Sequence, residues 1–217
     1  MSDDLATWRQ WIGRGETRED LAAPFPPHAL IQTFDTGDAR LKTGDALPPL
    51  WHWLYFLDTT PRSKLGPDGL PGRGDFMPPV SLPRRMWAGS RFTFHDTPLK
   101  LGDSLRRESA ITAIEGKSGS TGEMVFVTVR HRIFGAAGLA VEEEIDGVYR
   151  EAAKPGEVQK AGRPAPTDPT WSKTITPDPV LLFRFSALTF NPHRIHYDQP
   201  YTTTTEGYPG LIVHGPL

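Results

Sequence analysis

The sequence predicts an α+β fold in which an antiparallel sheet wraps around a helix, and two observations predict it. Residues 48–58, PPLWHWLYFLD, open with two prolines and are then bulky and apolar on all sides, which is typical of a buried helix. After residue 84, four stretches alternate apolar and polar residues as half-buried strands do: RMWAGSRFTFHD, DSLRRESAITAIEG, GEMVFVTVRHRIF and GLAVEEEIDGVYRE. A helix followed by long antiparallel strands gives two packed layers.

The remaining elements are less regular. Ser2 is expected to start a helix with Leu5, Trp8 and Ile12 on one face and Gly13 near its end. Residues 21–50 show no long period, and residues 59–83 form a long loop dense in Pro and Gly. We expect a first domain over residues 1–150, an exposed linker rich in Pro, Ala and Lys over 151–171, and the start of a second domain over 172–217.

Composition excludes several classes of protein. The 217 residues carry a net charge of -2, which gives no reason to expect a nucleic acid or an anionic membrane as partner. Cysteine is absent, so disulfides, thiolate catalysis and Cys-ligated zinc are excluded. No apolar run approaches the roughly 20 residues that span a bilayer, and the acidic N-terminus lacks the order of a signal peptide. We therefore expect a cytoplasmic protein.

Residues 188–198, LTFNPHRIHYD, hold the strongest local signal for chemistry. His193 and His196 lie three apart, next to Asn191 and to a proline that breaks regular structure. Two interpretations are open: a polar turn that contains histidines by chance, and a site of proton transfer. A second motif, GLIVHGPL, follows closely and ends the sequence.

FSALTFNPHRIHYDQPY followed by GLIVHGPL resembles the signature of the MaoC-like hydratases and dehydratases, which have the hot-dog fold. The resemblance implies two hot-dog repeats, the second incomplete, and places the family's catalytic His on His196 and its His-Gly motif on His214 and Gly215. The family's Gly falls on Phe190 and its catalytic Asp on Asn191. Its Asn-Pro pair falls on His193 and Arg194. With these changes the motif resembles that of a subgroup, which contains mesaconyl-CoA and itaconyl-CoA hydratases and mitochondrial 3-hydroxyacyl-thioester dehydratases.

The catalytic roles that this resemblance implies make chemical sense. Adding water to an enoyl thioester needs a base for the water proton and donors for the charge that builds on the thioester oxygen. His196 suits the first task near neutral pH, and the Gly215 N–H, at an expected helix start without a side chain, suits the second. Asn191 can only orient water or substrate by hydrogen bonds.

We expect the substrate to be held by arginines and by the other histidines. Arg84, Arg85 and Arg91 in PRRMWAGSR either form a solvated face or bind phosphate and carboxylate groups, and Arg194 is a further candidate for a substrate carboxylate. The remaining candidate ligands are His193, which alternatively only shapes a turn, and His214, which either fixes the helix start or lies near the thioester. No carboxylate spacing supports a zinc site on the three histidines, and we expect none.

The resemblance implies a hydro-lyase that reversibly hydrates a short dicarboxylic enoyl-CoA of the mesaconyl-CoA or itaconyl-CoA type. Two alternatives stay open: a 3-hydroxyacyl-thioester dehydratase of fatty chains, and a non-catalytic thioester-binding subunit. Coenzyme A enters only as part of the substrate, and no other cofactor is expected. We expect a homodimer or a higher homo-oligomer. Because the sequence stops two residues past Gly215, we also expect either a longer protein or a tail that docks onto another chain or onto the first domain. In either case the site residues are expected to be disordered or displaced.

Overall fold

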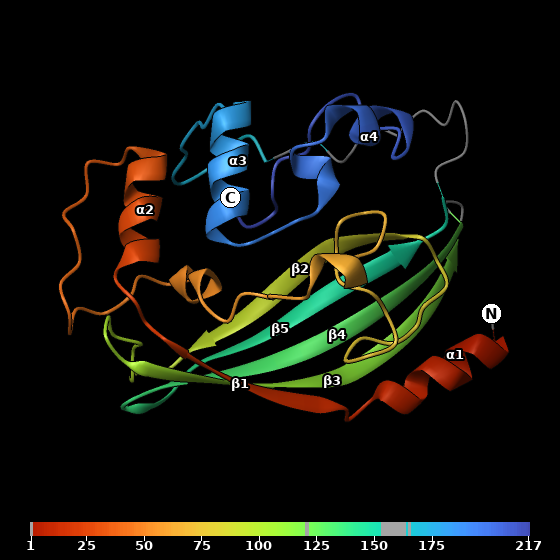
Figure 1. Ribbon diagram of the computed structural model, residues 1–217, viewed down its shortest axis with the longest axis horizontal. Coiled ribbons are helices and arrows are strands. Elements are labelled where there is room, and N and C mark those ends of the chain that lie inside the picture. Colours follow the sequence, from red (N-terminus) through yellow and green to blue (C-terminus); the bar gives the residue numbers. More distant parts are fainter. Residues whose placement is uncertain (1, 120–121, 153–163, 165) are drawn as a thin grey trace.

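The computed structural model describes residues 2–119, 122–152, 164 and 166–217. One antiparallel sheet of five strands dominates it, in the order β1-β3-β4-β5-β2 (Figure 1). The strands are β1 (Gly15–Leu21), β2 (Arg84–Phe94), β3 (Ser104–Gly119), β4 (Gly122–Gly135) and β5 (Gly138–Arg150). The four strands predicted from alternation are confirmed, and β1 was missed because this edge strand is mostly polar and exposed.

Alternation along the long strands gives the sheet a buried inner face. Two apolar clusters lie on this face, one around Leu105, Ile133 and Val141 and the other around Ile111 and Val127. Between them the same alternation places polar side chains on the buried face. These are Arg107 and Ser109 on β3, His131 on β4 and Glu143 on β5.

The helices are short and lie mostly over one face of the sheet. Rings of Phe34 and Phe185 stack at 6.2 Å between α2 and α3, which stand side by side (Figure 1). The predicted N-terminal helix is confirmed, with Trp8 buried, although Ile12 is exposed. The α-helices are α1 (Ser2–Trp8), α2 (Phe25–Phe34), α3 (Pro179–Leu188) and α4 (Gln199–Thr204), and 3-10 turns cover Arg9–Trp11, Trp51–Leu54, Arg62–Lys64 and Arg194–His196.

The predicted helix over residues 48–58 is wrong, although its burial is right. Only Trp51–Leu54 is helical, as a single 3-10 turn, because Leu50 and Phe56 adopt left-handed backbone angles (φ 72° and 57°). The segment instead binds the inner face of the sheet: His52 Nε2 lies 3.2 Å from a Glu143 carboxylate oxygen. Long-range packing and this buried carboxylate therefore override the helical pattern. The α+β class is confirmed, without a long central helix in this part of the chain.

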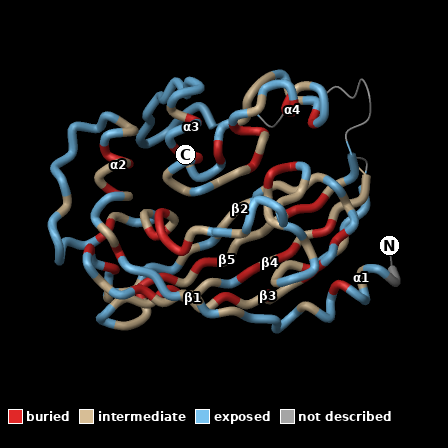
Figure 2. The backbone as a smooth tube through the Cα atoms, in the orientation of Figure 1, coloured by how far each residue is buried: buried red, intermediate tan, exposed pale blue. Residues whose placement is uncertain are grey.

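Residues 179–217 dock onto the first part of the chain. Phe185 joins the apolar cluster around Leu105, and the backbone N–H of Arg194 donates to the carbonyl of Asp68 at 2.9 Å. Figure 2 shows buried stretches both in this segment and along the central strands. Docking onto the first domain, one of the expected outcomes, is thus what the structure contains, and the expected displacement of the site residues is wrong.

The predicted linker over residues 151–171 falls largely outside the described residues, and the division into two domains stays a prediction. None of the helices in the described ranges is long and apolar enough to cross a membrane.

Candidate active site

The turn that follows α3 sets the position of the first histidine. Phe190 adopts φ 48°, a left-handed angle that a glycine would take without strain, and this reverses the chain. The side-chain Oδ1 of Asn191 then accepts a hydrogen bond from the backbone N–H of His193 at 3.0 Å. This local bond is typical of Asn in turns. It occupies the amide oxygen and leaves the amide NH2 group available.

Three imidazole rings come together behind this turn. The ring of His196 stacks on that of His214, with centroids 3.7 Å apart and 17° between the planes. His193 meets His196 edge-on, at 5.6 Å and 89°. All three side chains are buried. The structure therefore brings together residues that the sequence separates by up to 21 positions (193 to 214).

Burial keeps these histidines neutral near pH 7. It is the main reason why the pKa of His193 falls to about 4 and that of His214 to about 3, and the neighbouring imidazoles lower both further. Burial also lowers the pKa of His196, against a hydrogen bond to the Ile212 carbonyl that raises it.

The hydrogen bond of His196 defines its tautomer. Its Nδ1 lies 2.7 Å from the carbonyl oxygen of Ile212. Because a carbonyl can only accept, Nδ1 carries the proton and Nε2 holds the free lone pair. Nε2 makes no hydrogen bond within the part of the chain that the structure describes. A neutral imidazole with this free lone pair can accept a proton.

A cavity of about 530 Å³ adjoins the three histidines. It lies between the C-terminal segment and the ends of β2 and β5. Its walls include all three histidines, Asn191 and Gly215, and from the sheet Arg85, Met86, Trp87 and Tyr149. Among the described residues, no group of three His, Asp or Glu side chains could hold a metal ion.

Trp87 occupies the space beside Gly215. A Cβ atom added to Gly215 would lie 2.3 Å from Cε3 of the Trp87 ring, so the ring rests directly on the glycine. We expected the missing side chain to admit a thioester; in this structure it admits the indole. Trp87 is 45% exposed, and its ring N–H donates to Ser90 Oγ at 3.1 Å. The Gly215 N–H itself has no hydrogen-bond partner among the described residues.

Of the four candidate arginines, Arg85 is the one that lines this cavity. Its Nε and one Nη bind both carboxylate oxygens of Asp68 at 2.8 and 3.0 Å. Arg84 Nε instead donates to the Glu206 carboxylate at 2.7 Å. Arg91 is not brought to the site, because it lies exposed among carboxylates of β5.

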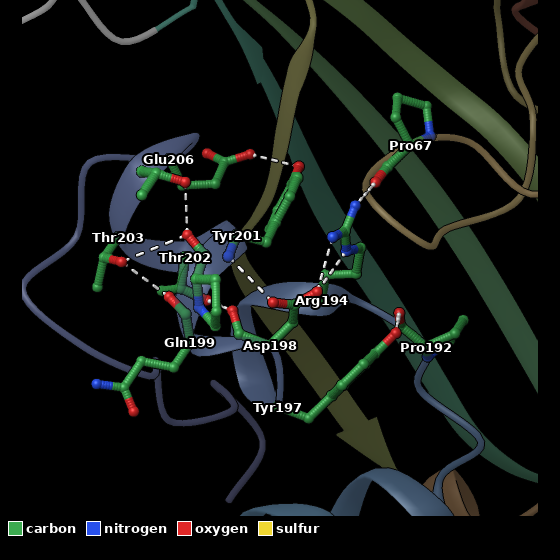
Figure 3. A network of polar contacts seen from close by, with 12 residues as sticks. Pro67, Pro192, Arg194, Tyr197, Asp198, Gln199, Tyr201, Thr202, Thr203 and Glu206 are labelled. Atoms are coloured by element: carbon green, nitrogen blue, oxygen red, sulfur yellow. Dashed lines mark hydrogen bonds and ion pairs between the residues drawn. The ribbon is translucent and has the colours of Figure 1, made fainter.

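Arg194 also turns away from the cavity, although it lies next to His193. It binds Asp198 at 2.7 and 2.9 Å and donates to the carbonyl oxygen of Pro67 at 2.9 Å (Figure 3). Asp198 also caps α4, since its other oxygen accepts the backbone N–H of Tyr201 at 3.0 Å. Arg194 therefore joins this turn to the distant loop that contains Pro67 and, through Asp198, to α4.

Sequence reasoning missed Asp68, Gly69, Trp87 and Ser186 as parts of this site. Gly69 (φ +89°) packs so closely on the turn that an added Cβ would lie 2.1 Å from the carbonyl oxygen of Pro192. The Gly- and Pro-rich composition of residues 59–83 was a signal of a functional loop. Ser186 lies inside the resembling stretch, but its partner is 28 residues away, which no local pattern indicates.

Comparison with known proteins now identifies the family. The family model described as hydroxyacyl-thioester dehydratase type 2 matches residues 50–217. The chain belongs to this family. It is 49% identical over 212 residues to the mesaconyl-C(4)-CoA hydratase of Chloroflexus aurantiacus, covering 98% of this chain and 75% of the relative. It is 30% identical to the mitochondrial hydroxyacyl-thioester dehydratase type 2 of Schizosaccharomyces pombe, covering 92% and 72%.

Solved structures confirm the hot-dog class of fold. HtdX of Mycobacterium tuberculosis superposes with a TM-score of 0.60 at 15% identity, over 94% of this chain and 72% of that one. A MaoC-like dehydratase from Phytophthora capsici gives a TM-score of 0.60 at 14% identity, over 94% and 71%. The predicted MaoC-like resemblance and the assignment as a hydro-lyase are confirmed at the level of this family.

Proposed function

We propose that this member of the hydroxyacyl-thioester dehydratase type 2 family reversibly adds water to a short dicarboxylic enoyl-CoA thioester of the mesaconyl-CoA type. The observation that carries the proposal is the 49% identity to a mesaconyl-C(4)-CoA hydratase over 98% of the chain. The site geometry supports a mechanism in which side chains and backbone suffice for the chemistry.

His196 is the proposed general base. Its unprotonated Nε2 takes a proton from water while the water oxygen bonds to the β-carbon of the enoyl group. The double-bond electrons move toward the thioester oxygen, which becomes an enolate. The protonated imidazole then returns a proton to the α-carbon and is neutral again. A pKa lowered by burial favours this neutral resting state.

Asn191 and Gly215 are the proposed polar partners of the reactants. The Asn191 oxygen already accepts the N–H of His193, so its NH2 group is left to orient water or substrate at the cavity wall. The Gly215 N–H donates to the thioester oxygen as negative charge develops there. The Trp87 ring lies against the Cβ side of the same glycine, and we expect it to shift when a thioester binds there.

Arg85 is the proposed partner of the distal substrate carboxylate. A guanidinium has five N–H donors, and Asp68 occupies only two of them. Three N–H groups remain, and one from each Nη atom can bind a second carboxylate in the forked geometry that Arg favours. His193 and His214 complete the wall of the same cavity.

A second candidate function is dehydration of longer 3-hydroxyacyl thioesters. A mostly apolar cavity of about 390 Å³ lies on the other side of Asn191 and would suit a fatty chain. Its wall includes Leu65, Phe183 and Phe190.

Hydration assays on the purified protein separate these functions. We expect mesaconyl-CoA to be hydrated faster than crotonyl-CoA or a medium-chain enoyl-CoA, with itaconyl-CoA measured alongside. Arg85→Met should lower kcat/KM for mesaconyl-CoA more than kcat/KM for crotonyl-CoA. Replacement of the exposed Arg91 with Met should change neither value. Preference for the medium chain would favour the second function. Binding without turnover of any substrate would identify a non-catalytic thioester-binding subunit.

A further inference from the structure

A buried hydroxyl contacts the histidine of the second motif. Ser186 lies on the buried side of α3 together with Leu182 and Phe185. Its Oγ is 2.7 Å from Nε2 of His214. The hydroxyl has no other hydrogen bond within the described residues. The lone pair of this ring nitrogen is therefore the acceptor available to the hydroxyl proton.

The other ring nitrogen of His214 is buried without a partner. The side chain is 2% exposed, and Nδ1 makes no hydrogen bond to any described residue. Leaving a buried polar group unsatisfied costs about 1–3 kcal/mol. The neighbouring Gly215 N–H is also unpartnered, and both residues line the cavity beside His196. Two unused hydrogen-bonding groups thus adjoin the proposed reaction site.

The direction of the hydrogen bond between Ser186 and His214 decides whether Nδ1 of His214 is a donor or an acceptor. If Nε2 carried the proton, the serine hydroxyl proton would have no acceptor and Nδ1 would be an unsatisfied acceptor. If the serine donates to Nε2, the imidazole proton lies on Nδ1 and only this donor lacks a partner. The second arrangement leaves fewer buried groups unsatisfied and is favoured. Burial, which lowers the pKa of His214 to about 3, keeps the ring neutral with one proton.

We propose that Ser186 is a positioning residue that holds the imidazole proton of His214 on Nδ1, where it acts with the Gly215 N–H as a second donor to the thioester oxygen. This inference rests on the proposed enoyl-thioester hydration. A donor held in place by a serine in a water-poor site stabilises the enolate without rearranging during the reaction. It also accounts for a buried, unpartnered nitrogen that packing alone leaves unexplained.

The chain offers a matched control for a serine-to-histidine bond. Ser109 is buried on the sheet, and its Oγ lies 2.8 Å from Nδ1 of the mostly buried His131. Neither residue lines the cavity beside His196. Ser109→Ala therefore removes the same kind of bond at a comparable structural cost, without touching the proposed site. Ser186→Thr keeps the hydroxyl, and Ser186→Cys is a near-isosteric variant with a weaker donor.

The experiment measures kcat and KM for mesaconyl-CoA hydration and the ¹⁵N NMR signals of His214. We expect Ser186→Ala to lower kcat by about 10²-fold, the usual effect of losing one such donor, with KM changed much less. Ser186→Thr should recover activity, and Ser109→Ala should stay within about twofold of wild type. In the wild type Nδ1 should carry the proton.

Three results would overturn the inference: equal effects of Ser186→Ala and Ser109→Ala on kcat, a loss confined to thermal stability, or a proton found on Nε2 of His214. If Ser186→Ala does not fold, Ser186→Cys and the wild-type NMR signals still decide. An inactive wild type would instead remove the proposed function and the oxyanion role with it, while the NMR measurement reports the tautomer independently.

Discussion

The rings of His196 and His214 stack at 3.7 Å with only 17° between their planes, and both side chains are buried. Two like charges so close in a poorly solvated site repel strongly, so the pair holds at most one added proton in the accessible pH range. In the proposed mechanism, the proton that His196 takes up is therefore received beside a ring that must stay neutral. The stacked pair therefore favours a neutral His196, which is the form that the proposed general base requires.

His196→Ala should lower turnover by at least about 10²-fold, the low end for losing a general base. The fold should survive, because the losses are confined to one hydrogen bond to the Ile212 carbonyl and the ring contacts with His193 and His214. Steady-state hydration and circular dichroism check both parts. His28→Ala, which removes a partly buried histidine that does not line the cavity, is the control. Near-normal rates for His196→Ala would remove this residue from the mechanism.

Hydration should stay constant over neutral pH and decline in acid, with an apparent pKa below the ordinary His value of about 6.5. The sign follows from burial, which lowers the pKa of His196 in the folded protein. A pH profile of kcat/KM measures it. An apparent pKa above about 7 for this limb would contradict the assignment of a neutral buried base.

Stability should fall as the medium is acidified below about pH 6.5. In the folded protein the pKa values of His193 and His214 are lowered to about 4 and about 3, whereas the unfolded chain binds protons near 6.5. Protonation then favours unfolding through this window. Denaturant titrations between pH 7.5 and pH 4.5 test the trend, and constant stability over that range would show that these rings are not buried.

Asn191→Asp should keep at least part of the hydration activity, and Asn191→Leu should be much less active. The carboxylate can still accept the backbone N–H of His193, which Asn191 accepts at 3.0 Å, whereas leucine leaves that group without its partner. Rates and melting temperatures of both variants are compared with wild type. Equal activity for the two would exclude Asn191 from the chemistry.

Gly69→Ala should destabilise the site more than Gly74→Ala. Both glycines have positive φ, +89° and +97°, so the backbone strain is similar. Only at Gly69 does a new Cβ meet backbone, 2.1 Å from the carbonyl oxygen of Pro192; at Gly74 its nearest neighbour is 3.7 Å away. We expect a loss of activity of tenfold or more for Gly69→Ala alone. Equal losses would show that this loop does not position the turn.

Gly215→Ala should force the Trp87 ring away, since the added Cβ would approach within 2.3 Å of it. Overpacking of this kind costs about 1–3 kcal/mol. Trp87→Ala in the same chain should restore most of the lost stability, which a double-mutant cycle of unfolding free energies measures. Binding of a CoA thioester to the wild type should change Trp fluorescence, and the change should be smaller in Trp87→Phe. Additive effects of the two substitutions would argue against the contact.

The sequence by itself determined the parts that depend on local pattern. Period-two alternation predicted β2 to β5, and the resemblance of residues 185–201 and the later His-Gly motif to a known signature predicted the family. These features depend on neighbours along the chain, so they are readable without coordinates. The order of the strands and the identity of each polar partner are not local properties.

Only the tertiary structure decided how the polar groups pair. Four candidate arginines look alike in sequence, yet Asp68 holds Arg85 at the cavity while Arg91 lies among the carboxylates of β5. The pattern of residues 48–58 predicts a helix, but the backbone turns at Leu50 and Phe56. His52 in this segment binds the buried Glu143, which is 91 residues away in the sequence. Ser186 finds its histidine 28 residues away. In each case a buried polar group must take the partner that the fold brings within hydrogen-bonding distance, and that distance is set by packing rather than by sequence spacing.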